Sequence, residues 1–271
     1  PPTGPPRSAA SPRGPSCSRP PASSAAAHPT ARLPARAASV RDYPDSPAAA
    51  VLFFIAARRT RGLPDQAENA GNGIPNRIHQ FWTEAHVPFD VAQYMATWRE
   101  THPAFEHCVW SDASARDWLA VHGSADVARA YDRVREPAMK ADLFRLALLH
   151  REGGIWVDAD DRCLRSVEPL LARGAGLLAY QEDLGSLGNN WLAAIANHPI
   201  VAEALNQATA AVNRGDGDIL WLSTGPGLLT RVAAQASCDG SGRADDLLVL
   251  DRSEFLSYAA IHCLAAYKTS D

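Results

Sequence analysis

Three carboxylates follow directly after a short apolar segment. Asp158, Asp160 and Asp161 come immediately after residues 155–157, which read Ile-Trp-Val. Residues two apart on an extended chain share one face, so we expect Asp158 and Asp160 on the same side. Clustered carboxylates repel one another unless a cation neutralises them, and hard oxygen ligands suit Mg²⁺ or Mn²⁺. The simpler alternative is an acidic turn exposed to solvent, because an Asp-x-Asp spacing is common by chance.

A second pair of charged residues precedes these carboxylates. Asp142 and Arg145 lie three residues apart in the segment 139–150, whose leucines recur at helical spacing. They therefore share one helix face, where a surface ion pair would be the plain explanation. Large apolar residues flank them, however, and predict a buried helix, in which charges require partners. The glycines at 153–154 turn the chain back, so we expect this pair beside Asp158, able to hydrogen-bond sugar hydroxyls.

Apolar periodicity and turn residues predict the elements that position these groups. Strands are expected at 78–82, 105–110, 155–157 and 176–180, and helices at 91–100, 111–119, 139–150, 199–212 and 228–235. Strands that alternate with helices predict an α/β class with a mostly parallel sheet. Ligands of such sheets bind at the carboxyl ends of strands, which is where the acidic cluster falls.

Charge is unevenly distributed over the 271 residues. Residues 1–41 contain six arginines and no acidic residue, whereas the remainder has a net charge of −10. An acidic body argues against a general nucleic-acid binder. Residues 1–50 are rich in Pro, Ala, Ser and Arg, resemble a transit peptide in composition, and contain few large apolar groups. We therefore expect residues 1–73 to be a disordered tail and linker with at most a short helix at 51–61, and residues 74–271 to form the folded domain.

Cysteine usage and hydropathy bear on the compartment. Five cysteines are scattered without a Cys-x-x-Cys pair, which fits neither a disulfide framework nor a zinc site. The apolar run at residues 51–57 is short, whereas a spanning helix needs about 20 residues. We expect no transmembrane segment, and a location in the cytoplasm or at the membrane periphery.

Five sequence blocks, taken in order, resemble a known family. They read IPNRIHQFW (74–82), KADLFR (140–145), GGIWVDADDRCL (153–164), GNNWLAAIANHPIV (188–201) and STGPGLLT (223–230). Together they resemble glycosyltransferase family 32, the DXD-containing sugar transferases that include fungal initiating mannosyltransferases and bacterial capsular polysaccharide transferases. The resemblance implies a GT-A fold, that is, a Rossmann-like domain that binds a nucleotide-sugar. It also implies a divalent cation, Mn²⁺ or Mg²⁺, and retention at the anomeric carbon.

The resemblance also implies roles for matching residues. Asp160 looks like the direct metal ligand, and Asp158 like a contact to the ribose, the sugar or the metal. Asp142 and Arg145 match residues that hold the donor sugar. Trp82 matches an aromatic residue that stacks on the nucleotide base, a use that suits its flat π-face. A core aromatic residue is the alternative for Trp82.

Further matches come with plainer alternatives. Asn189 and Asn190 fall in a block that lines the donor or acceptor side, and Asn190 is expected to contact the donor. His198 belongs to the same block, although a structural histidine is the alternative. The turn 224–226 is expected near the site, or as an ordinary loop. Relatives often carry Tyr where this chain has Trp156, which puts a hydroxyl contact from that position in doubt.

Asp161 and the segment 258–262 complete the set of residues that the resemblance concerns. Asp161 is expected either to support the site or to be exposed, and exposure is favoured. Residues 258–262 partly resemble a C-terminal segment of the relatives that contains His and Trp and contacts the diphosphate. We therefore expect the domain to be truncated at its C-terminus.

These observations predict a hexosyltransferase. It would use a UDP- or GDP-sugar donor and a glycan or lipid-linked acceptor, and no catalytic base is assigned, because the leaving phosphate can act as base. One alternative is a non-catalytic module that binds nucleotide-sugars or glycans. Another is a Mg²⁺-dependent phosphatase of the haloacid-dehalogenase type, but Arg162 stands where that class usually carries Thr or Val.

Overall fold

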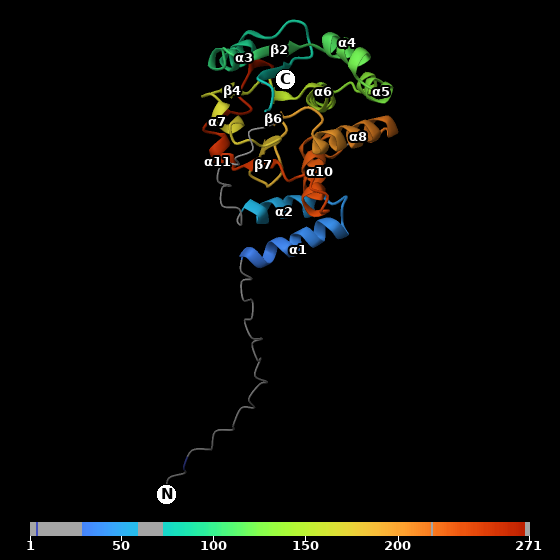
Figure 1. The fold of residues 1–271 in the computed structure, drawn as a ribbon, viewed down its shortest axis with the longest axis vertical. Helices are drawn as coiled ribbons and strands as arrows, with labels where there is room; N and C mark the ends of the chain where they lie inside the picture. Colours follow the sequence, from blue (N-terminus) through green and yellow to red (C-terminus); the bar gives the residue numbers. More distant parts are fainter. Residues whose placement is uncertain (1–3, 5–28, 59–72, 218, 269–271) are drawn as a thin grey trace.

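A six-stranded sheet forms the centre of the molecule (Figure 1). The computed structural model describes residues 4, 29–58, 73–217 and 219–268. The strands, in the spatial order β2-β1-β3-β6-β5-β7, are β1 (Arg77–Phe81), β2 (Glu106–Trp110), β3 (Gly154–Val157), β5 (Leu177–Tyr180), β6 (Trp191–Ala194) and β7 (Leu247–Leu250). Only β6 runs antiparallel to its neighbours β3 and β5 in this sheet. The predicted α/β class with a mostly parallel sheet is therefore confirmed.

Helices cover both faces of the sheet. The longer ones are α3 (Phe89–Thr101), α4 (Asp112–His122), α5 (Ala125–Arg133), α6 (Pro137–Glu152), α8 (Pro199–Arg214) and α10 (Pro226–Cys238), and the shorter ones are α7 (Glu168–Leu171), α9 (Leu220–Ser223), α11 (Arg252–Phe255) and the 3₁₀ turn η1 (Ala266–Lys268). Alternate residues of β3 face opposite layers, since Trp156 belongs to the core cluster that contains residues of α4, α5, α6, α8 and α10, while Ile155 and Val157 belong to the cluster that contains residues of α3, α7 and α11. Two core layers thus sandwich the strand that ends at the acidic cluster.

The turn between α6 and β3 depends on two glycines. Pro137 begins α6 at a position where its missing N–H costs nothing, and Gly153 and Gly154 follow the helix with φ of +69° and +102°. A Cβ at Gly153 would lie 2.7 Å from the backbone nitrogen of Ala196, so only glycine fits. This turn sends β3 back along the buried helix, as the sequence predicted.

The N-terminal prediction is wrong for residues 29–58. Helices α1 (Pro29–Asp42) and α2 (Pro47–Arg58) pack against each other and against α10 (Figure 1). Phe53 and Phe54 of α2 are buried in the same core as α10. The sequence suggested only a short helix at 51–61, because the surface that covers these phenylalanines lies about 180 residues away in the chain. The other residues of the expected tail and linker lie outside the described ranges.

Several elements were not predicted from periodicity. They include α1, α5, β6, β7 and a small antiparallel pair formed by β4 (Arg162–Cys163) and β8 (Ala259–Ala260). The β4–β8 pair matters most for the site, because it brings the chain beyond residue 258 next to the acidic cluster. Among the helices that the structure describes, none combines the length and the apolar character needed to cross a bilayer.

Candidate active site

Asp158 lies at the carboxyl end of β3 and is held by two donors. Its Oδ1 accepts hydrogen bonds from Nη2 of Arg145 and from Nε1 of Trp156, each at 2.8 Å. The guanidinium of Arg145 also lies over the Trp156 ring, 5.0 Å from its centroid, a cation–π contact. Burial raises the pKa of Asp158, and the positive charge of Arg145 opposes that shift. Position 156, where relatives often carry Tyr, therefore contacts this carboxylate through an indole N–H and not through a hydroxyl.

Arg145 also bonds to Asp142 from the same helix, α6. Its Nη1 donates to Oδ1 of Asp142 at 2.9 Å, and both side chains are nearly inaccessible to solvent. Nδ2 of Asn189 donates to the same oxygen at 2.8 Å, and the hydroxyl of Thr224 donates to Oδ2 at 2.9 Å. Burial raises the pKa of Asp142, while Arg145 lowers it. The predicted meeting of Asp142 and Arg145 with Asp158 is confirmed, and a surface ion pair is excluded.

The two remaining carboxylates differ in exposure. The side chain of Asp160 is 13% exposed and forms an ion pair with the ammonium group of Lys268 in η1. Asp161 is fully buried, so the favoured expectation that it is exposed is wrong. The reason is its long-range partners, since Oδ2 accepts from Nδ2 of Asn190 at 2.5 Å and Oδ1 accepts from the backbone N–H of His262 at 2.7 Å.

Asn190 belongs to the supporting structure of the acidic turn. Its backbone oxygen accepts from the N–H of Asp158 at 2.8 Å, and its Oδ1 accepts from the hydroxyl of Tyr180 at 2.5 Å. With its Nδ2 bonded to Asp161, both ends of the amide are engaged with protein groups. Contact between Asn190 and a donor stays a prediction. Tyr180 lies within an expected strand, but nothing in the sequence linked it to the site.

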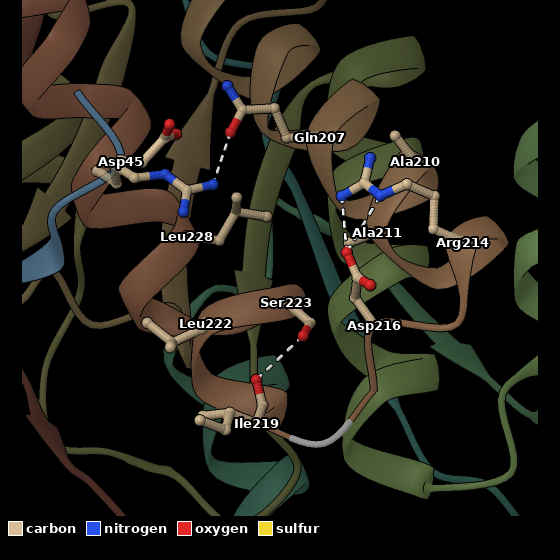
Figure 2. A pocket seen from close by; sticks show the side chains of 11 residues that line it. Asp45, Gln207, Ala210, Ala211, Arg214, Asp216, Ile219, Leu222, Ser223 and Leu228 are labelled. Atoms are coloured by element: carbon tan, nitrogen blue, oxygen red, sulfur yellow. Dashed lines mark hydrogen bonds and ion pairs between the residues drawn. The ribbon is translucent and has the colours of Figure 1, made fainter.

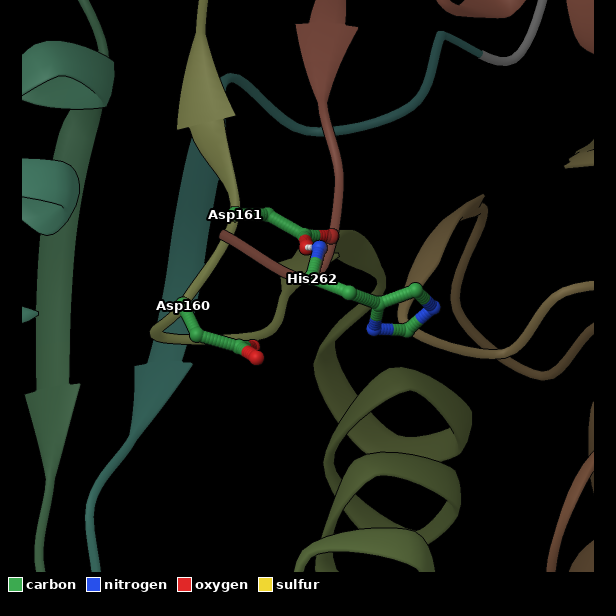
Figure 3. Close-up of side chains that lie close together, drawn as sticks. All are labelled: Asp160, Asp161 and His262. Atoms are coloured by element: carbon green, nitrogen blue, oxygen red, sulfur yellow. Dashed lines mark hydrogen bonds between the residues drawn. The ribbon is translucent and has the colours of Figure 1, made fainter. Parts of the chain in front are cut away.

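Figure 3 shows a group of side chains that could hold a cation. One ligand atom from each of Asp160, Asp161 and His262 lies within 4.8 Å of the others, and carboxylates with an imidazole form a donor set that accepts Mn²⁺. The sequence instead paired Asp158 with Asp160 as metal residues. Asp158 is not in this group and already bonds to Arg145, whereas Asp160 belongs to both sets. Residues 258–262 resemble a C-terminal segment that contacts the diphosphate in the relatives, and the structure places His262 of this segment beside Asp160; contact with a diphosphate stays a prediction.

Trp82 lies beside the acidic turn. It is partly buried and packs against a small cluster that contains Ala159, between the two DXD aspartates, and Ala265 of the C-terminal segment. Its backbone N–H donates to the oxygen of Trp110 at 2.9 Å. The ring is therefore close to the predicted donor site, and stacking on a base stays a prediction.

His198 has a structural place. It is fully buried and precedes α8, where its Nδ1 accepts from the N–H of Ile200 at 3.2 Å. Its Nε2 lies 3.1 Å from Oδ1 of Asp246, and burial lowers its pKa. These partners explain His198 as a helix cap, which was the plainer of its two interpretations.

A separate hollow of about 510 Å³ lies among α8, α9 and α10 (Figure 2). Three of its charged side chains already have protein partners, since Arg214 pairs with Asp216 at 2.8 Å and Arg231 donates to Gln207 at 2.8 Å. Ser223 lines this hollow, while the next residue, Thr224, bonds to Asp142. None of the acidic-cluster residues lines it.

Comparisons with known proteins agree with this geometry. Residues 88–176 match the family model described as "Glycosyltransferase sugar-binding region containing DXD motif". The chain is 27% identical over 137 residues to "Inositol phosphoceramide mannosyltransferase 3" of Schizosaccharomyces pombe, which covers 51% of this chain and 38% of that protein. It is 32% identical over 107 residues to "Initiation-specific alpha-1,6-mannosyltransferase" of the same yeast, covering 37% and 26% respectively. The match thus spans less than half the length of these relatives.

Solved structures show the same fold. The PaToxG glycosyltransferase superposes with a TM-score of 0.51 at 17% identity, covering 75% of this chain and 81% of that one. The UDP-bound glycosyltransferase domain of the YGT toxin gives a TM-score of 0.50 at 10% identity, covering 74% and 82%. These results show a DXD-containing glycosyltransferase region at residues 88–176, which include Asp142, Arg145 and the DXD aspartates, in a chain that has the GT-A fold.

Proposed function

We propose that this protein transfers a hexose from a nucleotide-diphosphate sugar, a UDP- or GDP-sugar, to a hydroxyl of a glycan or lipid-linked acceptor. The observation that carries the proposal is the position of Arg145, whose two Nη atoms join Asp142 and Asp158 at the carboxyl end of β3. Ligands of α/β sheets bind at this edge. The names of the fungal relatives favour mannose as the hexose and an inositol phospholipid or a glycan as the acceptor.

The chain's own residues suit the binding of a sugar. The side chain of Asp158 remains 29% exposed, so its second oxygen can accept a hydrogen bond from a sugar or ribose hydroxyl. Asp142 and Arg145 fix the direction of that carboxylate through buried, charge-assisted bonds, which are shorter and stronger than neutral ones. Rigid positioning of this kind favours one orientation of the donor. Trp82 would lie against the base.

The residues beside the sheet edge also suit a divalent cation. Asp160 and His262 would hold Mn²⁺ or Mg²⁺, with Asp158 as a further candidate. When bound, the cation supplies positive charge that stabilises the departing diphosphate. Arg145 adds a fixed positive charge nearby. No side chain is assigned as a general base, and retention at the anomeric carbon is part of the proposal.

The surroundings of the reaction follow from the same proposal. We place the protein in the cytoplasm or at the membrane periphery, where it would meet both a nucleotide-sugar and a lipid-linked acceptor. No nucleic-acid partner is proposed. A non-catalytic module that binds a nucleotide-sugar is the second candidate, because Asp160 is paired with Lys268 in the present arrangement and binding does not require turnover.

The test is a donor panel with the full chain. Purified protein would be incubated with UDP- and GDP-hexoses, and nucleotide release and calorimetric binding would be measured with Mn²⁺, with Mg²⁺ and with chelator. We expect one donor to bind and turn over only with cation. We expect Asp160→Ala to lower turnover by about 100-fold or more, while Asp117→Ala, an exposed aspartate on α4, leaves it unchanged. Binding without turnover favours the module, and no binding of any donor contradicts the proposal.

A further inference from the structure

Asp161 is a buried acid that the proposed reaction does not use. Its side chain is inaccessible to solvent, and it lies close to two other carboxylates, Asp158 and Asp160. A carboxylate in such a place costs free energy unless hydrogen bonds compensate for the lost water. The negative charges of Asp158 and Asp160 nearby add to that cost. A residue this costly requires a structural reason.

The reason is a line of hydrogen bonds that joins four separate segments of the chain. The Tyr180 hydroxyl on β5 donates to Oδ1 of Asn190 at 2.5 Å, and Nδ2 of Asn190 donates to Oδ2 of Asp161 at 2.5 Å. Oδ1 of Asp161 then accepts from the N–H of His262 at 2.7 Å. Asp161 therefore connects the central sheet to the C-terminal segment, 101 residues further along the chain.

His262 is the point in that segment that most requires a fixed partner. Its φ of +51° lies in the left-handed region, which residues other than glycine adopt at a cost. Next to it, the N–H of Cys263 donates to the backbone oxygen of Asp160 at 3.0 Å. Two successive amides thus bond to the acidic turn, and Figure 3 shows the Asp161 carboxylate against the backbone of His262.

We propose that Asp161 is a positioning residue, whose buried carboxylate fastens the backbone of His262 to the acidic turn and so holds the imidazole beside Asp160 for a divalent cation. This inference rests on the cation site of the proposed function. Groups that orient metal ligands without touching the metal typically change affinity about 10- to 100-fold when they are removed. Both oxygens of Asp161 already accept hydrogen bonds, whereas Asp160 and His262 are the more exposed members of the group.

The hydrogen-bond pattern explains why an aspartate is required at 161. Both of its partners, Nδ2 of Asn190 and the N–H of His262, are donors, so both oxygens must accept. An asparagine at 161 would turn its own NH₂ group towards one of these donors. Exchanging the two residues restores the pattern, because an aspartate at 190 could accept from Tyr180 and from the new asparagine, whose oxygen would still accept from His262.

The experiment uses the full chain with Asp161→Asn, with the exchanged pair Asp161→Asn/Asn190→Asp, and with Asp117→Asn as matched control. Two quantities are measured: the Mn²⁺ dissociation constant, by electron paramagnetic resonance, and the hydrogen-exchange rates of the His262 and Cys263 amides. We expect Asp161→Asn to weaken Mn²⁺ binding by about 10- to 100-fold and to speed exchange at His262. The exchanged pair is expected to return both towards the parent values, and the control to change neither.

Several results would overturn the proposal. A folded Asp161→Asn protein with unchanged Mn²⁺ affinity contradicts it, even if exchange at His262 accelerates. If Asp161→Asn does not fold, the exchanged pair decides, and a folded pair with weak Mn²⁺ binding and fast exchange contradicts it. Failure of the parent chain to bind Mn²⁺ contradicts the cation site of the proposed function instead, which separates the two failures.

Discussion

The indole nitrogen of Trp156 donates a hydrogen bond to the carboxylate of Asp158, two residues later in the chain, at 2.8 Å. This contact follows from strand geometry, since residues two apart share one face. The same indole ring lies under the guanidinium of Arg145, which bonds to the same carboxylate oxygen. The Trp156 side chain therefore contacts both members of the ion pair, the Asp158 carboxylate through its N–H and the Arg145 guanidinium through its ring face.

Trp156→Phe removes that donor while keeping an aromatic ring under Arg145. A bond from a neutral donor to the charged form of a carboxylate lowers its pKa, so its loss raises the pKa of Asp158. We expect the acid limb of the activity profile to move to higher pH, and KM for the donor to rise more than kcat falls. Initial rates against pH measure both. Trp221→Phe, a half-exposed residue on α9, is the control, and an unmoved acid limb would show that the indole N–H has no electrostatic effect on Asp158.

Two substitutions of Arg145 distinguish its contribution to stability from its contribution to the site. Arg145→Met leaves Asp142 and Asp158 without their shared cation, and breaking a buried charge pair typically costs about 3–5 kcal/mol. Arg145→Lys keeps the charge but cannot donate to both carboxylates from a rigid fork. We expect Met to lower the free energy of unfolding strongly, and Lys to lower it less while still abolishing most turnover. Urea unfolding and nucleotide release measure the two, and full activity of the Lys variant would contradict the bridging role.

The sequence predicted the parts of the site that are close together in the chain. Helix α6, the two glycines and β3 could be found because apolar spacing and glycine punctuation mark them, and they bring Arg145 to Asp158 over a separation of 13 residues. The burial of Asp161 could not be predicted, because its partner His262 is 101 residues away. The strands β4 and β8, which bring the segment of His262 next to the acidic turn, are too short to show a pattern in the sequence.

The same limit explains the N-terminal error. Residues 47–58 are apolar but follow a stretch rich in proline and alanine, so no local signal indicated a partner. Their burial depends on α10, a helix near the other end of the chain. Residues 1–50 are indeed poor in large apolar groups, yet Ala49 and Ala50 are buried in the same core as Phe53 and Phe54. Small side chains pack closely without a strong hydrophobic signature.

The buried His79 on β1 is expected to lower the free energy of unfolding in acid. Burial lowers the pKa of His79 from 6.5 to about 4, so the imidazole is neutral in the folded protein at neutral pH. Its Nδ1 accepts a hydrogen bond from Nε1 of Trp110 at 3.3 Å. The unfolded chain takes up a proton at a higher pH than the folded protein does. The stabilisation by His79 is therefore complete above pH 6.5 and is lost as pH falls towards 4.

We expect the free energy of unfolding of the parent chain to fall by about 2–3 kcal/mol from this group alone between pH 7 and pH 4.5. His79→Gln should reduce the pH dependence by about that amount, whatever its effect at pH 7. Urea titrations at several pH values measure the difference, with His86→Gln, an exposed histidine, as control. Parallel pH dependences of the parent and His79→Gln would contradict the assignment.

The ammonium group of Lys268 is expected to compete with a divalent cation for Asp160. Its ammonium pairs with Asp160, and its Nζ also donates to the backbone oxygen of Cys263 at 3.2 Å. The segment before it is fixed to α3, because Tyr94 donates to the oxygen of Leu264 at 2.6 Å and the N–H of Ala266 donates to Asp90 at 2.6 Å. A cation that binds Asp160 must therefore displace or share a positive charge already held there.

Lys268→Met removes the competing charge and keeps the length of the side chain. Partly exposed ion pairs contribute up to about 1 kcal/mol, so we expect Mn²⁺ to bind roughly two- to fivefold more tightly. Lys268→Arg keeps the charge and should leave the affinity near that of the parent. Calorimetric titration at two ionic strengths measures the change, which should shrink at high salt because screening weakens the competing pair. Unchanged or weaker Mn²⁺ binding in Lys268→Met would mean that the ammonium does not compete for Asp160, and that this ion pair belongs to the packing of the C-terminal segment alone.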